Sequence, residues 1–291
     1  MRDFEYPAPK TLEEAVALLE RYGATAKLMA GGTDLVIMLN DHMVAPEHVV
    51  DVKGVPELNR FAWNPERGLT IGASVPFRRL ETSAEVQQYY PGMYEAASEV
   101  GSWQIRNQAT PVGNLCTASP ACEVGPIMYA LDATVQIAGP RGRRTLPIQQ
   151  FITGVRRTAL EPNEMVVDIQ VPPPGDRAAS HYIKLKERQK MDIAFVGVAA
   201  TVALEPGDGV IREARIALGA VAPTPIRAAQ AESSLRGQKL SDEVLEAVGR
   251  AAAESARPIM DVRASVAYRT EMISVLTKRA VRQAATLASQ R

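Results

Sequence analysis

Two short segments of this sequence combine small residues with side chains that form hydrogen bonds. The first, Leu28–Leu35 (LMAGGTDL), places two adjacent glycines between an apolar run and a Thr-Asp pair. Glycine has no Cβ atom, so it adopts positive φ without strain and leaves neighbouring amide N–H groups uncovered. Consecutive uncovered amides form a concave site for an anion, most often a phosphate. A tight turn with Thr33 or Asp34 capping a helix explains the same residues, and this segment by itself favours the turn.

The second segment, NQATPVGNLCTASPACE, covers residues 107–123. Its small side chains allow the backbone to approach a ligand closely. Thr110, Asn114 and Thr117 supply hydroxyl and amide groups for hydrogen bonds, and Glu123 is placed to accept hydrogen bonds from ligand hydroxyls. Taken alone, the segment predicts an ordered polar loop with a structural role.

The common phosphate-binding and hydrolytic motifs do not occur. The sequence has no GxxxxGK[ST], GxGxxG, HExxH or GxSxG pattern. Its two cysteines, Cys116 and Cys122, match no usual ligand spacing, and the three histidines do not cluster. We therefore expect no protein-held metal, and any redox chemistry requires an organic cofactor.

Composition excludes several classes of protein. The 291 residues are 46% hydrophobic and contain 33 Lys+Arg and 33 Asp+Glu, so the formal net charge is zero. A balanced charge does not favour binding to nucleic acid. Apolar runs such as Val196–Leu204 are too short to span a bilayer, and the N-terminus lacks the apolar core of a signal peptide. We expect a cytoplasmic protein with no integral membrane segment.

Hydrophobic periodicity predicts a mixture of helices and strands in two domains. A capping box at Thr11–Glu14 begins a helix that ends at Gly23, and Asp34–Leu39 opens either a helix or a strand. The Pro-rich break at Pro172–Asp176 separates a domain of residues 1–174 from one of residues 175–291. Further helices are predicted at 84–103, 125–131, 241–256 and 265–289, and strands at 26–30, 48–52, 68–73, 133–138, 164–171, 180–186, 194–204 and 211–219.

Several segments together resemble one known family. Gln104–Asn107 precedes the second segment, Lys184–Arg188 is followed by Asp192-Ile193-Ala194, and Gly219–Pro225 and Asp261–Arg269 lie near the C-terminus. In this order, and with the AGGT turn, they are similar to the FAD-binding (medium) subunit of the molybdenum hydroxylases. That family includes the medium subunit of aerobic carbon monoxide dehydrogenase and the FAD domain of xanthine dehydrogenase. The resemblance covers nearly the whole chain.

The resemblance implies an α+β fold. It predicts a p-cresol-methylhydroxylase-type FAD-binding domain of two α+β subdomains, about 1–55 and 56–174, followed by an antiparallel three-stranded sheet covered by helices. Both segments would bind the FAD diphosphate, and no side chain would act as a catalyst or a metal ligand. The implied cofactor-binding residues are Leu28, Met29, Ala30, Gly31, Gly32, Thr33, Asp34, Leu35, Val100, Thr110, Val112, Gly113, Asn114, Thr117, Glu123, Val166 and Lys184.

Some of these residues depart from the family pattern or have simpler explanations. Val112 replaces a family glycine and is expected to narrow the backbone approach to FAD unless it keeps a negative φ, while Glu123 replaces an aspartate. Without the resemblance, Lys184 is expected to be a solvated strand lysine. Glu123 would serve equally well as a helix cap. Trp103 is expected in the core.

The resemblance also implies a function. The chain would be the FAD-binding electron-transfer subunit of a heterotrimeric molybdenum hydroxylase, passing electrons from iron–sulfur clusters of a small subunit to an external acceptor. Molybdopterin would belong to a large subunit, and the complex is expected to form a dimer of heterotrimers. Alone, the chain would not act on the substrate. Two alternatives are a self-sufficient FAD-dependent oxidoreductase and an assembly or regulatory protein that keeps the fold without flavin.

Overall fold

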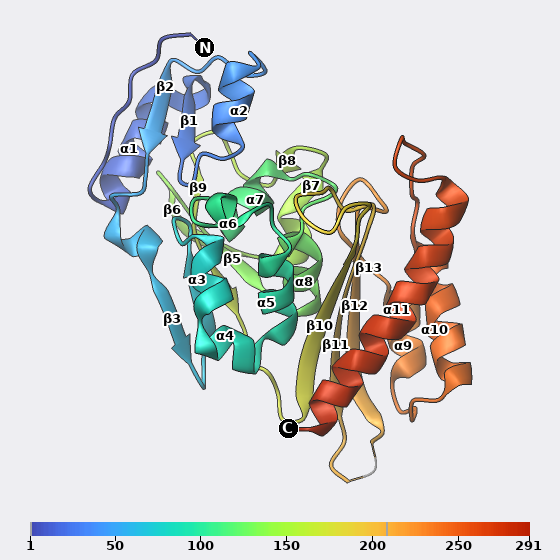
Figure 1. Cartoon of the computed structure of the whole chain (residues 1–291). Coiled ribbons are helices and arrows are strands. Elements are labelled where there is room, and N and C mark those ends of the chain that lie inside the picture. Colours follow the sequence, from blue (N-terminus) through green and yellow to red (C-terminus); the bar gives the residue numbers. More distant parts are fainter. Residues whose placement is uncertain (1, 208) are drawn as a thin grey trace.

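The chain begins with a small lobe built on two parallel strands. The computed structural model describes residues 2–207 and 209–291. In it, β1 (Ala26–Met29) pairs with β2 (His48–Asp51), and the lobe also holds α1 (Leu12–Tyr22) and α2 (Leu35–Asn40) (Figure 1). Half of the predicted capping box is confirmed, because Thr11 Oγ1 accepts the amide of Glu14. The return hydrogen bond from Glu14 Oε2 goes to the amide of Lys10 and not to that of Thr11.

A five-stranded antiparallel sheet follows the lobe. Its strand order is β3-β4-β9-β5-β6, and its central strand β9 is buried along most of its length. A hairpin of two shorter strands, β7 (Ile152–Gly154) and β8 (Arg157–Thr158), lies outside this sheet. The five strands are β3 (Phe61–Asn64), β4 (Gly68–Gly72), β5 (Thr134–Gly139), β6 (Gly142–Pro147) and β9 (Met165–Val171).

The helical part of the first domain consists of short helices. The spacing over residues 84–103 predicted one helix, but the structure has two, because Pro91 lacks the amide that would continue α4 and restricts Tyr90 before it. Pro91 instead occupies the first turn of α5, where no amide partner is needed. The helices are α3 (Phe77–Thr82), α4 (Ala84–Tyr89), α5 (Pro91–Ser98), α6 (Trp103–Arg106), α7 (Pro111–Thr117) and α8 (Val124–Ala130).

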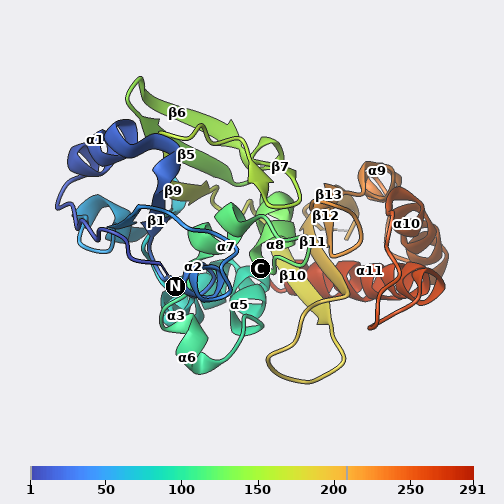
Figure 2. The ribbon, with the colours of Figure 1, turned by 90° about the horizontal axis from the view of Figure 1, so that it is seen from above.

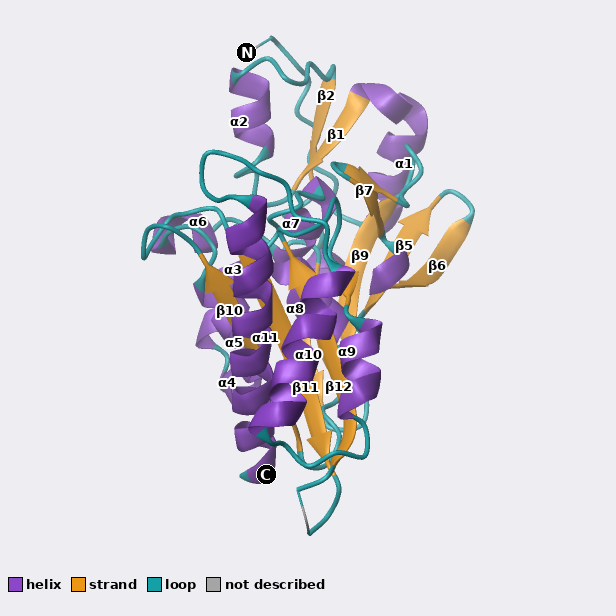
Figure 3. Ribbon diagram, turned by 90° about the vertical axis from the view of Figure 1, so that its right-hand side faces the viewer, coloured by secondary structure: helices purple, strands orange, loops and turns teal. Residues whose placement is uncertain are grey.

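The C-terminal part is an antiparallel sheet between two sets of helices. The three predicted strands are confirmed as β10 (Ala178–Leu185), β11 (Val196–Leu204) and β12 (Ile211–Gly219), and a two-residue strand, β13 (Ile226–Arg227), adds to the edge. The structure also contains α9 (Ala229–Leu235), which the sequence pattern did not predict. α9 and α11 (Val266–Ser289) cover one face, and α10 (Asp242–Ser255) packs outside them (Figure 3).

The opposite face of this C-terminal sheet packs against the first domain. Helices α5 and α8 contact β10, β11 and β12, and Tyr182, Ala199 and Ala217 of the sheet belong to the first domain's core. Seen from above in Figure 2, the sheet and helices α9–α11 lie to one side of α8, and β5 and β6 lie to the other. This contact brings β10 next to the segment that follows α7. Among the described residues, no helix is sufficiently long and apolar to cross a membrane.

The loop before α11 is held by one carboxylate. Asp261 accepts the amide of Arg263, and this hydrogen bond, supported by one from the amide of Ala264 and by the guanidinium of Arg269, lowers the pKa of Asp261 to about 2. Because the folded-state pKa lies below the usual value of 3.8, the ionised form stabilises the fold above pH 4. This contribution is lost as the pH falls toward 2.

We therefore expect Asp261→Asn to flatten the decline of the unfolding free energy between pH 4 and pH 2. Urea unfolding at several pH values measures this decline. Asp242→Asn is the control, because Asp242 forms an exposed ion pair with Arg282. An unchanged acid profile in Asp261→Asn would contradict the assignment.

Candidate cofactor-binding site

The double-glycine turn connects β1 to α2. Gly32 has φ +72°, and its carbonyl accepts the amide of Val36, which begins the helical turn of α2. In the described part of the chain, the amides of Gly31, Gly32, Thr33 and Asp34 have no hydrogen-bond partner. The turn therefore has the run of free backbone donors that the sequence suggested.

The sequence predicted that the second segment is a loop. In the structure it is a loop only in part, because residues 111–117 form α7. Thr110 caps this helix: its Oγ1 accepts the amide of Gly113 at 2.9 Å. Pro111 occupies the first turn, where its missing amide costs nothing. The Thr-Pro pair thus starts a helix whose first free amide is that of Val112, and a helix N-terminus favours an anion.

The two segments lie in direct contact. A Cβ atom at position 31 would lie 2.0 Å from the carbonyl oxygen of Gln108 and 2.9 Å from the Cα of Ala109. Gly31 is therefore required by the close approach of the two backbones. Across the same contact, Thr117 Oγ1 donates to Asp34 Oδ2 at 2.7 Å. Residues about 80 positions apart in the sequence are thus held as one unit.

Val112 meets the condition under which its side chain was not expected to narrow the site. Val112 lies in the first turn of α7, is not among the residues with positive φ, and is 5% exposed. Its side chain packs in the first domain's core, so only its backbone is available to a ligand.

We accordingly expect Val112→Gly to destabilise the fold without tightening FAD binding. Loss of a buried valine side chain and a glycine in a helix together lower the unfolding free energy by about 2–4 kcal/mol. Urea unfolding and titration with FAD measure the two quantities. A variant that binds FAD more tightly than the wild type would show that Val112 obstructs the site.

Glu123 and Lys184 form a buried ion pair across the contact between the domains. Lys184 Nζ lies 2.8 Å from Glu123 Oε1 and 3.1 Å from the carbonyl oxygen of Glu99, and its side chain is 1% exposed. The simpler explanation for Lys184 is wrong, because its side chain is not solvated. Glu123 does occupy the N-cap position of α8, as the alternative predicted, but its side chain makes no capping hydrogen bond. Lys186 extends the cluster by pairing with the carboxylate of Glu99.

The remaining candidate residues have backbone or core positions. Val100 follows Glu99, and its carbonyl accepts a hydrogen bond from Arg106 at 3.0 Å, so it adjoins the ion-pair cluster. Val166 is a buried residue on β9, and no hydrogen bond described in the structure joins it to the two segments. Leu28 and Met29 end β1, Leu35 begins α2, and Ala30 lies in the bend between them.

Sequence reasoning missed two features near these residues. Trp103, expected in the core, is 62% exposed, and the guanidinium of Arg78 lies 4.4 Å from its ring centre. Burial raises the pKa of the Cys116 thiol to about 12 and raises that of Cys122 as well, so neither provides a thiolate at neutral pH. Cys122 instead forms a hydrogen bond to Asn114, for which the spacing of the cysteines gave no signal.

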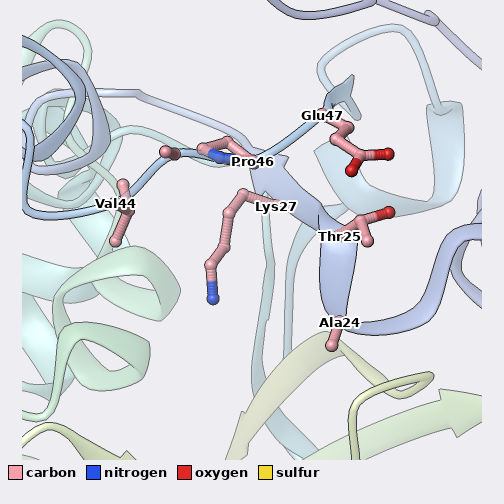
Figure 4. Close-up of a pocket in the computed structure, with 7 residues that line it drawn as sticks. Ala24, Thr25, Lys27, Val44, Pro46 and Glu47 are labelled. Atoms are coloured by element: carbon pink, nitrogen blue, oxygen red, sulfur yellow. The ribbon is translucent and has the colours of Figure 1, made fainter. Parts of the chain in front are cut away.

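A hollow of about 320 Å³ lies beside β1 but does not include the glycines. It is lined by Lys27 and by residues 24, 25 and 44–47, and Figure 4 shows the Lys27 side chain extending into it. Among the described residues, no group of three His, Cys, Asp or Glu side chains is arranged to hold a metal ion.

The contacts above fit a bound dinucleotide. Uncovered amides at Gly31–Asp34 and at the start of α7 suit the two phosphates, and the small residues of the turn leave their backbones accessible. Asn114 Nδ2 has no hydrogen-bond partner among the described residues, so it is available to donate to a ligand.

Comparisons with known proteins show that the chain is an FAD-binding subunit of an oxidoreductase, and they identify its family. Residues 2–174 match the FAD binding domain in molybdopterin dehydrogenase, and residues 181–284 match the CO dehydrogenase flavoprotein C-terminal domain. The chain belongs to this family of FAD-binding subunits of molybdenum hydroxylases.

Relatives match nearly the full length of the chain. The xanthine dehydrogenase FAD-binding subunit of Escherichia coli O157:H7 is 35% identical over 98% of this chain and 97% of its own. The carbon monoxide dehydrogenase medium chain of Hydrogenophaga pseudoflava is 37% identical over 97% and 96%. A structure of carbon monoxide dehydrogenase from that organism has a TM-score of 0.93 at 36% identity, covering 99% and 98% of the two chains. The fold predicted from the resemblance is confirmed.

Proposed function

We propose that FAD is held by the Gly31–Asp34 turn and the start of α7, with its diphosphate on their free amides. This pair of segments carries the proposal, because Gly31 and Gln108 lie in contact and both backbones present unpaired N–H groups. FAD supplies the redox chemistry when bound. The chain binds the cofactor, orients it and controls its exposure.

Glu123 and Lys184 would border the same cofactor. The carbonyl of Glu99 and the carboxylate of Glu123 fix the Lys184 ammonium in place. Because the two opposite charges of the pair cancel, the role expected of Lys184 is to hold the Glu123 carboxylate in place. Val100 and Val166 would contribute backbone or apolar contacts, and their assignment rests on the family pattern alone.

The chain works within a larger assembly in this proposal. Its relatives are named as subunits or medium chains of xanthine, carbon monoxide and nicotinate dehydrogenases. Because one FAD subunit type accompanies such different substrates, the substrate would be recognised by the molybdopterin-containing large subunit. Iron–sulfur clusters of a small subunit would deliver the electrons, and two heterotrimers would form a dimer.

Purification of the chain alone and with its native partner subunits tests the assignment. We expect the chain alone to bind FAD without turning over substrate. We expect substrate to reduce the FAD only in the complex. Substrate turnover by the chain alone would identify a self-sufficient oxidoreductase, and a complex without flavin would identify a regulatory or assembly protein.

A further inference from the structure

The buried thiol of Cys122 contacts a residue of the proposed FAD site. Cys122 lies just before α8, and its Sγ donates to Asn114 Oδ1 at 2.9 Å. The same sulfur accepts the amide of Gly125 at 3.2 Å. The thiol therefore links the start of α8 to the carboxamide of Asn114 in α7.

The thiol hydrogen has one available direction. Burial raises the pKa of Cys122, so the sulfur keeps its proton at neutral pH. Because the Gly125 amide occupies an acceptor position of the sulfur, the S–H group is directed toward Asn114 Oδ1. The amide of Val124 also points at this oxygen, at 3.4 Å.

Two donors on one oxygen fix the orientation of the Asn114 carboxamide. An amide oxygen only accepts and an amide nitrogen only donates. A flipped carboxamide would place its NH₂ group against the Val124 amide, a contact between two donors. Oδ1 therefore faces α8, and Nδ2 faces away from it.

The free Nδ2 group belongs to a residue on the helix face that contacts the first segment. Asn114 and Thr117 are three residues apart on α7, so they share a face of the helix. Thr117 contacts Asp34 of the double-glycine turn on that face. The NH₂ group of Asn114 is thus available where the two segments meet.

We propose that Cys122 is a positioning residue for FAD, acting by fixing the Asn114 carboxamide with its NH₂ group toward an oxygen atom of the cofactor. The inference rests on the proposed function. The thiol itself takes no part in electron transfer. It fixes the Asn114 side chain before FAD binds, so binding does not have to overcome the entropic cost of fixing it.

Titration of the full chain, freed of flavin, with FAD tests this role through the dissociation constant. We expect Cys122→Ala to weaken FAD binding by about fivefold to tenfold, the size of one ordinary hydrogen bond. Cys122→Ser, which keeps a donor and an acceptor, is expected to bind within about twofold of the wild type. Cys116→Ala is the matched control, because Cys116 lies in α7 and has no side-chain hydrogen bond among the described residues.

Asn114→Ala separates this inference from the proposed site. If Asn114→Ala leaves FAD affinity unchanged, Asn114 does not contact the cofactor and the positioning role fails, while the site itself is tested by Gly31→Ala. If Asn114→Ala weakens binding but Cys122→Ala does not, or if Cys122→Ser is as weak as Cys122→Ala, only the positioning role is overturned. Cys122→Ala should add nothing in an Asn114→Ala background. Should Cys122→Ala unfold, Cys122→Val, which fills the space without a donor, takes its place.

Discussion

Replacing Gly31 with alanine is expected to lower the affinity for FAD by at least about 100-fold, or about 2.7 kcal/mol. The new Cβ atom would lie 2.0 Å from Gln108 O, 2.7 Å from Gln108 C and 2.9 Å from Ala109 Cα. All three are main-chain atoms, so no side-chain rotation relieves the overlap. The two segments must separate, and the free amides no longer converge on one diphosphate.

The same substitution should also lower the unfolding free energy by about 1–3 kcal/mol, as overpacked sites do. FAD titration and urea unfolding measure the two effects. Gly154→Ala is the matched control, because a Cβ atom there meets only the Arg157 side chain, at 3.7 Å. Wild-type affinity in a folded Gly31→Ala protein would show that FAD binds elsewhere.

The second large effect is expected for Lys184→Met. Removing the ammonium leaves the Glu123 carboxylate, whose side chain is 14% exposed, without its cation, and leaves the Glu99 carbonyl without this donor. Breaking a buried pair from one side costs about 3–5 kcal/mol of unfolding free energy. We expect FAD binding to weaken as well, because Glu123 would reorient.

A double variant distinguishes the lost pair from lost packing. Lys184→Met combined with Glu123→Gln should recover much of the stability, since no unpaired charge stays buried. Lys278→Met serves as the surface control. Lys278 pairs with Glu246, whose side chain is 53% exposed. Exposed pairs of this kind contribute at most about 1 kcal/mol to the unfolding free energy. A loss below about 1 kcal/mol in Lys184→Met would contradict the importance of the buried pair.

For the double-glycine turn, the sequence predicted the uncovered amides but gave only one of the two reasons why glycine is needed there. Residues 31 and 32 were predicted to leave amides uncovered, and the amides of the turn are unpaired in the described structure. The sequence did not reveal that Gly31 also meets the Gln108 backbone. That contact joins segments whose spacing along the chain carries no information about their distance in space.

Local signals explain most of the elements that were predicted correctly. The cap at Thr11 and the apolar run of β11 depend on neighbours a few residues away. The same signals failed where one residue overrode a longer pattern. Pro91 divided the helix predicted over residues 84–103, and Thr110-Pro111 started a helix where a loop was expected.

The sequence by itself determined most of the strands and the longer C-terminal helices, the absence of common phosphate motifs and, through several segments in register, the family. Only the tertiary structure decided which side chains meet. Lys184 lies 61 positions after Glu123, and Val112 points into the core rather than toward a ligand. Burial and pairing depend on how the C-terminal sheet packs against α5 and α8. That packing comes from many weak apolar contacts spread over both domains, so no short stretch of sequence encodes it.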